Sequence, residues 1–259
     1  MDMPNHSDGT VGKALCVLDA VAKFAQPVRF TQLLEVTPFP KPTLYRYLQT
    51  LVSQNMLQFD SHTSTYSLGP RLLQLAHVAW QSASLAPIAR SHIERLAQRV
   101  GQAVHLAQLD NGQVMFVDKL VAQGRVQTLA QIGQVAPAYC TGVGKAMLAF
   151  IEPGRLEIVL QQQSYFRYTS ATHANAQSLR LELDQIRSEG VAFDRQEHQT
   201  GINSLAAPIL SQTGRVMGAL SIATFTSLFD CEGLRAFEDD LLDTAAKIGK
   251  DASAWHLPT

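Results

Sequence analysis

Between residues 40 and 52, apolar side chains recur with the period of an α-helix. Leu44, Tyr47, Leu48 and Leu51 are spaced by three and four residues, so one face of this helix can be buried. The polar residues between them then point outward, where their side chains can hydrogen-bond phosphates and base edges. A major groove admits one such helix, so the pattern predicts a recognition helix that contacts DNA. The predicted DNA-contacting residues on it are Lys41, Thr43, Tyr45, Arg46, Gln49 and Thr50.

The segments around this helix complete the pattern of a winged helix-turn-helix. An apolar stripe over residues 11–25 predicts a first helix, which Pro27 ends because proline disfavours helix in the residue before it. Thr31 can cap a second helix over residues 32–36, and prolines then break the chain before the recognition helix. After it, two short strand-like runs, 56–59 and 65–68, flank a turn-forming cluster and predict a wing.

A further helical pattern begins at residue 69 and runs to about residue 84, and Pro87 marks the start of another helix. The pattern predicts a linker helix between two domains, although the same stripe would also suit a helix buried in a core. We therefore expect a DNA-binding domain at residues 1–68, a linker helix at 69–85 and a second domain at 86–259.

The second domain combines hairpins with separate helices. Residues 104–109 and 114–117 form a hairpin pattern around Asn111 and Gly112, because these residues tolerate the positive φ angles of a tight turn. A similar unit recurs further along, and two helical stripes accompany the strands. Hairpins with separate helices indicate an α+β fold with an antiparallel sheet, and not a doubly wound parallel sheet. The second hairpin covers residues 205–210 and 216–223, and the helical stripes cover 179–186 and 234–248.

Length and composition limit the class of protein. A chain of 259 residues is long enough for two domains, and no apolar run approaches the roughly 20 residues that cross a bilayer. Residues 1–10 lack the apolar core of a secretion signal, so we expect a cytoplasmic protein with no membrane partner. Cys16, Cys140 and Cys231 are too far apart for a CxxC zinc or redox pair and are expected to be free thiols. No cofactor is expected.

Charge contributes little to the predicted DNA binding. Residues 1–84 contain six Lys or Arg and five acidic residues, a net charge of about +1, and no basic arm. Long-range attraction to phosphate is therefore small. Affinity must then come from two or more copies that each place a recognition helix in a half-site, so we expect a homo-oligomer on a double-stranded operator.

The loop at residues 139–146 is the main candidate for a small-molecule site. Gly142 and Gly144 leave backbone N–H groups unobstructed, and the helix that follows adds a partial positive charge, so a carboxylate or phosphate can bind. A nucleotide-binding P-loop is excluded, because its first glycine and its final Ser or Thr are missing. The alternative is that both glycines only form a turn. Asp194 and Ser204 adjoin strand-like runs, where each could face a cavity or lie in water.

Residues that could support catalysis or bind a metal are scattered along the chain. Ser204 and Ser221 lack the flanking glycines of a nucleophile elbow, and no HExxH motif occurs, so we expect no catalytic residues. The spacing of the metal-competent residues is no ligand signature, so no metal site is expected. Two alternatives stay open: an enzyme that uses the glycine loop as an anion site, and a metal-responsive regulator built on His105, Asp194 and His198.

Several segments match the motifs of one family in the same order along the chain. They are residues 41–51, 66–69, 141–146, 167–169, 190–195 and 201–209. On these residues the chain resembles the IclR-type transcriptional regulators over nearly its whole length. The resemblance implies a winged helix-turn-helix, a linker helix and an effector-binding domain related to GAF and profilin-like sensors. It also implies assembly as dimers that often pair into tetramers.

The resemblance also implies an effector pocket. Ser204 stands where the family commonly has Cys, and is therefore a departure. Thr128 and Ala136 are small and Arg125 can pair with a carboxylate, so we expect an organic acid of more than two or three carbons. An aromatic acid is the hypothesis. The implied pocket residues are Arg125, Thr128, Ala136, Ile202, Asp194, Ser204 and, through their backbone amides, Gly142 and Val143.

The predicted wing is a second departure from the family, which often has a basic residue there. Residues 61–65 offer neutral contacts apart from His62, so phosphate contacts must come from the recognition helix and Arg71. We interpret the chain as a sequence-specific DNA-binding repressor or activator whose effector changes the arrangement of its helix-turn-helix units. The expected partners are double-stranded operator DNA, a small organic acid and further copies of the chain, as a dimer or tetramer.

Overall fold

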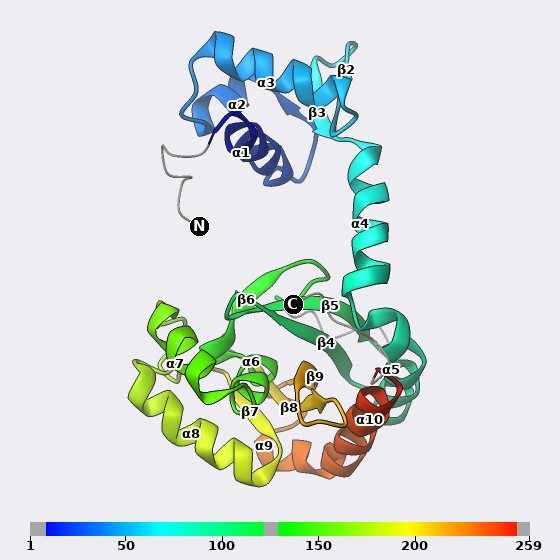
Figure 1. Cartoon of the computed structure of the whole chain (residues 1–259), viewed down its shortest axis with the longest axis vertical. Coiled ribbons are helices and arrows are strands. Elements are labelled where there is room, and N and C mark those ends of the chain that lie inside the picture. The colour runs from blue at the N-terminus through cyan, green and yellow to red at the C-terminus, as the bar shows by residue number, and fades with distance from the viewer. Residues whose placement is uncertain (1–8, 122–128, 253–259) are drawn as a thin grey trace. The chain divides into compact units, whose positions relative to one another are not determined.

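The computed structural model describes residues 9–121 and 129–252 (Figure 1). The chain divides into two compact units at the bond between Ala79 and Trp80. Among the described residues, no helix combines the length and the apolar character needed to cross a membrane.

The N-terminal unit packs helices against a small antiparallel sheet with strand order β1-β3-β2. Its elements are α1 (Thr10–Ala22), β1 (Val28–Arg29), α2 (Phe30–Val36), α3 (Lys41–Ser53), β2 (Leu57–Asp60) and β3 (Thr65–Leu68).

The helix α3 forms where the apolar stripe predicted it. Pro42 lies in its first turn, where the missing N–H costs nothing because the helix has no acceptor for it there. The four stripe residues Leu44, Tyr47, Leu48 and Leu51 are all buried. They pack in the core of the unit together with residues of α1 and with Leu57 and Tyr66 of the two wing strands. The predicted burial of this face is confirmed.

Two boundaries in this unit differ from the sequence expectation. α1 ends at Ala22 instead of residue 25, and the chain then turns into β1, a short strand that the pattern did not predict. β1 pairs Val28 with Tyr66, so the segment is held by a partner far along the chain. α2 begins at Phe30, and its cap is Arg29, whose N–H donates to the Gln32 side chain at 2.9 Å. The expected cap, Thr31, lies inside the helix because the sheet pairing fixes where the helix starts.

The helix α4 (Pro70–Ala83) occupies the range expected for the linker helix. None of its residues is buried. Leu72 is partly buried against the N-terminal core, whereas Leu73 and Leu75 are exposed. The apolar stripe of this helix is therefore not a core stripe of either unit.

The C-terminal unit is built on an antiparallel sheet with the order β6-β5-β4-β9-β8-β7. Its strands are β4 (Ala103–Asp110), β5 (Gln113–Val121), β6 (Val135–Pro137), β7 (Ala192–Arg195), β8 (Ile202–Leu210) and β9 (Val216–Phe225). Its helices are α5 (Ala86–Val100), η1 (Ala138–Cys140), α6 (Gly142–Leu148), α7 (Pro153–Gln162), α8 (Ala176–Glu189), α9 (Cys231–Leu234), η2 (Arg235–Phe237) and α10 (Glu238–Asp251).

Helices cover both faces of this sheet (Figure 1). Successive residues of a strand point to opposite faces, so Leu205 and Ala207 of β8 join the core with α5 and α10, while Ala206 joins the core with α6, α7 and α8. The predicted turn between β4 and β5 has φ angles of +47° at Asn111 and +77° at Gly112, as a tight hairpin requires. The α+β class with an antiparallel effector-domain sheet is confirmed.

Candidate functional site

The outer face of α3 carries the residues predicted to contact DNA. The Arg46 guanidinium lies 5.6 Å from the centre of the Tyr47 ring, and the Thr50 hydroxyl donates to the Arg46 carbonyl at 2.9 Å. The Tyr45 ring packs edge-on against Phe30 at 6.5 Å. This face of α3 therefore presents the Arg46 guanidinium, the hydroxyls of Tyr45 and Thr50 and the Gln49 amide close together. Lys41, Tyr45, Arg46, Gln49 and Thr50 are exposed, and Thr43 is partly buried.

Arg71 lies beside the end of this helix, whereas the wing residues Phe59 and Ser64 lie beside its start, near Lys41. Arg71 donates from Nη1 to the Gln54 carbonyl at 3.3 Å and to the Gln54 side chain at 3.0 Å, so it secures the end of α3 as well as presenting a charge. In the wing turn, Asp60 accepts the His62 N–H and the Thr63 hydroxyl, both at 2.8 Å. These hydrogen bonds lower the pKa of the Asp60 carboxyl, so it stays ionised in the wing.

A cavity of about 40 Å³ lies at the start of α6, where that helix meets the sheet. Five of the residues expected to bind an effector line it: Gly142, Val143, Asp194, Ile202 and Ser204. The other lining residues are His105, Phe116, Leu129, Ala130, Thr141, His198, Gln199, Ser221 and Ala223.

Of the three remaining residues expected to bind an effector, only Ala136 lies among the described residues. Ala136 lies on β6, opposite Val114 of β5, and is buried in the core beneath α6 and α7, so it does not line the cavity. Arg125 and Thr128 lie outside the described residues.

Two glycines allow α6 to approach the sheet closely. A Cβ on Gly142 would lie 2.8 Å from the Ser204 hydroxyl, and one on Gly144 would lie 2.4 Å from the Ala138 carbonyl oxygen. Any larger residue at Gly144 would therefore collide with backbone. The glycines do more than form a turn, because they bring the first residues of α6 against Ser204.

Asp194 and Ser204 face each other across the β7–β8 register and are both buried. Asp194 lies inside β7 and not at its end in water, so that alternative is wrong. Its carboxylate accepts the Glu197 N–H at 2.7 Å. Burial, and then the neighbouring Glu197 charge, raise the pKa of Asp194 to about 7.

The sequence reasoning missed most of the cavity wall formed by β4, β5 and β9. His105 and Ser221 are register partners on β4 and β9, and the His105 Nδ1 lies 3.4 Å from the Ser221 hydroxyl. Burial lowers the pKa of His105 to about 3, so its imidazole is neutral. The ring packs edge-on against Phe116 of β5 at 5.7 Å. The sequence indicates His105 only as a possible metal ligand, because nothing local in the sequence pairs it with β9.

Lys145, in the glycine loop, points away from the cavity. Its ammonium is fully buried and lies 2.8 Å from Glu182 Oε1 and 2.5 Å from Glu197 Oε1. The lysine is therefore engaged by two carboxylates and cannot reach an anion in the cavity. Lys145 therefore gives no support to the alternative of an enzyme with a phosphate site at this loop, and the described residues that line the cavity include no lysine or arginine.

The metal-binding alternative placed His105, Asp194 and His198 together. All three line the cavity. Among the described residues, however, the histidine and carboxylate atoms that lie close enough together to hold one metal ion belong to His173, Glu182 and Glu197. Cys140, which could also bind a metal, is buried outside the cavity lining, and burial raises the pKa of its thiol.

Two family models match the chain. The model described as "IclR helix-turn-helix domain" matches residues 10–61, and "Bacterial transcriptional regulator IclR C-terminal" matches residues 77–250, more than half of the chain. The chain belongs to the IclR family. IclR-family proteins are transcriptional regulators with a DNA-binding helix-turn-helix and an effector-binding C-terminal domain, and such regulators are not enzymes.

Two named transcriptional regulators are similar to this chain over nearly its whole length, in agreement with its place in the IclR family. The chain is 28% identical to the HTH-type transcriptional regulator XynR of Escherichia coli K12 over 241 residues, which cover 93% of this chain and 96% of XynR. It is 27% identical to KdgR of the same organism over 258 residues, which cover 100% and 98%.

Solved structures share the fold of this IclR-family chain. A putative transcriptional regulator from Rhodococcus sp. RHA1 has a TM-score of 0.81 and 26% identity, with 93% of this chain and 97% of that chain covered. An IclR homolog from Microbacterium hydrocarbonoxydans, complexed with 4-hydroxybenzoate, has a TM-score of 0.81 and 23% identity, with 95% and 100% covered. The predicted winged helix-turn-helix and effector-domain fold are confirmed.

Proposed function

We propose that this IclR-family regulator binds a double-stranded operator as a homo-oligomer through α3, and that an organic acid of aromatic size controls it from the cavity at α6. The observation that carries the proposal is the meeting of Asp194, Ser204 and the first residues of α6 at one cavity. Those groups come from three separate elements, and each is polar and buried.

The chemistry of the cavity suits an acid with a second polar group. The backbone N–H groups at Gly142 and Val143 can donate hydrogen bonds to a carboxylate, because they begin a helix. Asp194, Ser204 and Ser221 can exchange hydrogen bonds with a hydroxyl, and Phe116 supplies an aromatic wall. The Microbacterium homolog, which shares the fold, carries 4-hydroxybenzoate, a ligand with this pair of groups.

The size of the cavity indicates how such a ligand would act. The space of about 40 Å³ holds only a few waters, whereas a benzene ring occupies a cavity of roughly 150 Å³. An aromatic acid therefore binds a wider conformation than the one described. A ligand that favours one conformation shifts the protein toward it, which is how effector binding can change the geometry of the DNA-binding units.

Isothermal titration calorimetry with a panel of organic acids tests the effector site. We expect 4-hydroxybenzoate or a related aromatic acid to bind, and Asp194→Asn to weaken binding by about tenfold or more, because a buried polar partner is changed. Asp110→Asn, an exposed aspartate on the β4–β5 hairpin, is the matched control. Binding of pyruvate or glyoxylate alone would contradict the ligand class, and an unchanged affinity in Asp194→Asn would contradict the site.

Selection of bound duplexes from a random pool, followed by gel-shift titration, tests the DNA-reading surface. We expect Arg46→Ala to abolish specific binding while leaving the fold intact, because a cation at the centre of the α3 face is lost. Lys23→Ala removes one exposed positive charge after α1 and should leave specific binding nearly unchanged. Equal operator affinity of Arg46→Ala and the wild type would reject this role for Arg46.

A further inference from the structure

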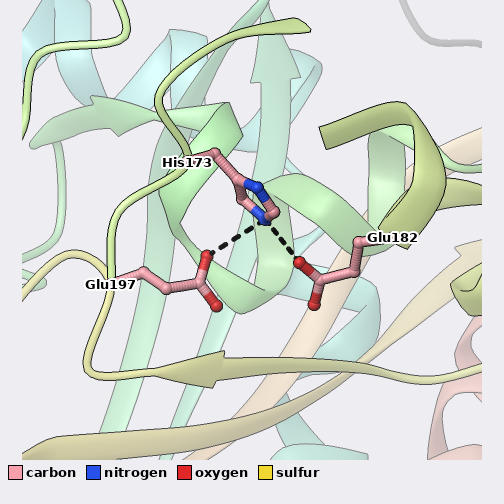
Figure 2. Close-up of side chains that lie close together, drawn as sticks. All are labelled: His173, Glu182 and Glu197. Carbon is pink, nitrogen blue, oxygen red and sulfur yellow. Dashed lines mark hydrogen bonds and ion pairs between the residues drawn. The ribbon is translucent and has the colours of Figure 1, made fainter. Parts of the chain in front are cut away.

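A second polar cluster lies beside the effector cavity without lining it. It consists of His173, which precedes α8, Glu182 on α8, and Glu197, which follows β7 (Figure 2). The side chains of His173 and Glu182 are 15% and 16% exposed, and that of Glu197 is 4% exposed. One ligand atom from each residue lies within 4.8 Å of the other two.

The two oxygens of each carboxylate in the cluster face different residues. The Oε1 atoms of Glu182 and Glu197 accept from Lys145, and Glu182 Oε1 also accepts from Arg195 at 2.9 Å. The Oε2 atoms turn to the other side, toward the His173 imidazole, which lies between them (Figure 2). The His173 Nε2 is 2.5 Å from Glu182 Oε2 and 3.8 Å from Glu197 Oε2.

One of these four carboxylate oxygens lacks a hydrogen-bond partner in the part of the chain that the structure describes. Glu197 Oε2 is buried and accepts no hydrogen bond from any described residue, because 3.8 Å from His173 is too long for one. Buried polar atoms are nearly always hydrogen-bonded, and leaving a charged oxygen without a partner is costly. The atom points into the space that it shares with His173 and Glu182 Oε2 (Figure 2). It therefore indicates a ligand that binds from that space.

We propose that His173 Nε2, Glu182 Oε2 and Glu197 Oε2 bind one divalent transition-metal ion, of the Zn²⁺ class. One imidazole nitrogen and two carboxylate oxygens are a donor set that Zn²⁺ accepts, with an open position left for water. Donors at about 2.0–2.1 Å around a tetrahedral ion lie about 3.4 Å from one another. The His173–Glu197 separation is already close to this value, and the His173–Glu182 pair opens by about 1 Å when the ion replaces their hydrogen bond.

Groups around the three ligands hold them in this orientation. The His173 Nδ1 lies 3.2 Å from the Ser178 hydroxyl, a contact that can keep the proton on Nδ1 and leave the Nε2 lone pair for the ion. Lys145 and Arg195 fix the far oxygens of the carboxylates. Their charges also offset those of the two carboxylates, so we expect weaker binding than at a site with unpaired carboxylates.

The position of the site links it to the effector cavity. The Glu197 N–H donates to Asp194, which lines the cavity, and His198 lines it as well. An ion on Glu197 would therefore join the segment 194–198 to α8. This link depends on the effector function proposed above, whereas the metal site itself does not.

Calorimetric titration of the metal-free full-length chain with Zn²⁺ tests the proposal. We expect one site per chain, and we expect His173→Gln to lower the affinity at least about tenfold. His92→Gln is the matched control, because His92 is similarly covered, at 12% exposed, but faces a single carboxylate, Asp251, at 2.8 Å. It should bind Zn²⁺ like the wild type. Metal-free thermal unfolding of each variant shows whether it folds.

A second variant and a second readout keep the test decisive if His173→Gln folds poorly. Ser178→Ala removes only the Nδ1 partner and should weaken Zn²⁺ binding severalfold, and Co²⁺ bound to the wild type should show the visible absorption of a tetrahedral site. Zn²⁺ should also raise the unfolding temperature of the wild type and of His92→Gln, but not that of His173→Gln. Absence of Zn²⁺ binding by the wild type overturns the proposal. So does wild-type affinity in a folded His173→Gln, or an equal loss in His92→Gln.

Discussion

The effector cavity and the cluster around Lys145 border the same short segment, residues 194–198, but they bury charge in different ways. In the cluster, the Lys145 ammonium lies within 2.8 Å of two carboxylate oxygens, so its charge is compensated by direct pairing. In the cavity, burial shifts the pKa of Asp194 up to about 7 and that of His105 down to about 3, and both shifts favour the neutral form. Paired charges hold a structure together, whereas neutral polar groups can exchange their partners for a ligand. We therefore expect the Lys145 pairs to contribute mainly stability, and the cavity groups to exchange partners with the proposed effector.

Removing the Lys145 side chain should cause the largest loss of stability among the changes considered for the two regions. Lys145→Met leaves Glu182 and Glu197 without their shared cation, and breaking a buried pair in this way typically costs about 3–5 kcal/mol. We expect a loss of this order in the free energy of unfolding, measured by urea denaturation at neutral pH without metal. The loss should greatly exceed that of any single change among the neutral groups of the cavity.

The control is an exposed lysine in an ion pair with the same kind of partner. Lys247 contacts Asp243 at 2.5 Å, but both side chains are more than half exposed, so Lys247→Met should cost at most about 1 kcal/mol. Similar losses in the two lysine variants would contradict the stabilising role of the cluster.

A smaller effect should come from His105 on the cavity side. Its folded pKa of about 3 lies below the unfolded value of 6.5, so protonation favours the unfolded state. The contribution of His105 to stability should therefore fall as the pH decreases from about 6.5 toward 3, whereas Asp194, whose folded pKa of about 7 lies above its usual 3.8, contributes the opposite trend. His105→Gln keeps a polar side chain without this titration, so its unfolding free energy should fall less steeply over that range, as measured by denaturant titrations at several pH values. An unchanged slope would show that His105 is not held neutral by burial.

How far the sequence predicts each part depends on how local the contacts are. The stripe of α3 and the Asn111–Gly112 turn were predictable, because a helical face and a tight turn are set by neighbouring residues. The start of α2 was not, since it depends on the pairing of β1 with β3. The predicted start of α2 is therefore wrong at a place where a distant strand determines the local conformation.

The same distinction separates the two sites. The glycine loop is predicted from its own residues, Asp194 and Ser204 are candidates from their places beside strand-like runs, and the resemblance groups all of them in one pocket; the structure brings them to one cavity. His105 and Ser221 meet only because β4 pairs with β9 across more than a hundred residues. The cluster of His173, Glu182 and Glu197 was not found from the sequence, because its members lie on a loop, a helix and a second loop with no common spacing.

The narrowness of the cavity at α6 also has a consequence for rates. An acid as large as a substituted benzene ring exceeds the space of about 40 Å³, so its entry must follow, or drive, a movement of the walls. If opening comes first, the observed association rate will rise with ligand concentration and then level off at the rate of opening, well below the diffusion limit. Stopped-flow mixing would then report how fast the protein opens, and a switch of this kind would respond at a speed set by its own motion and not by the supply of metabolite.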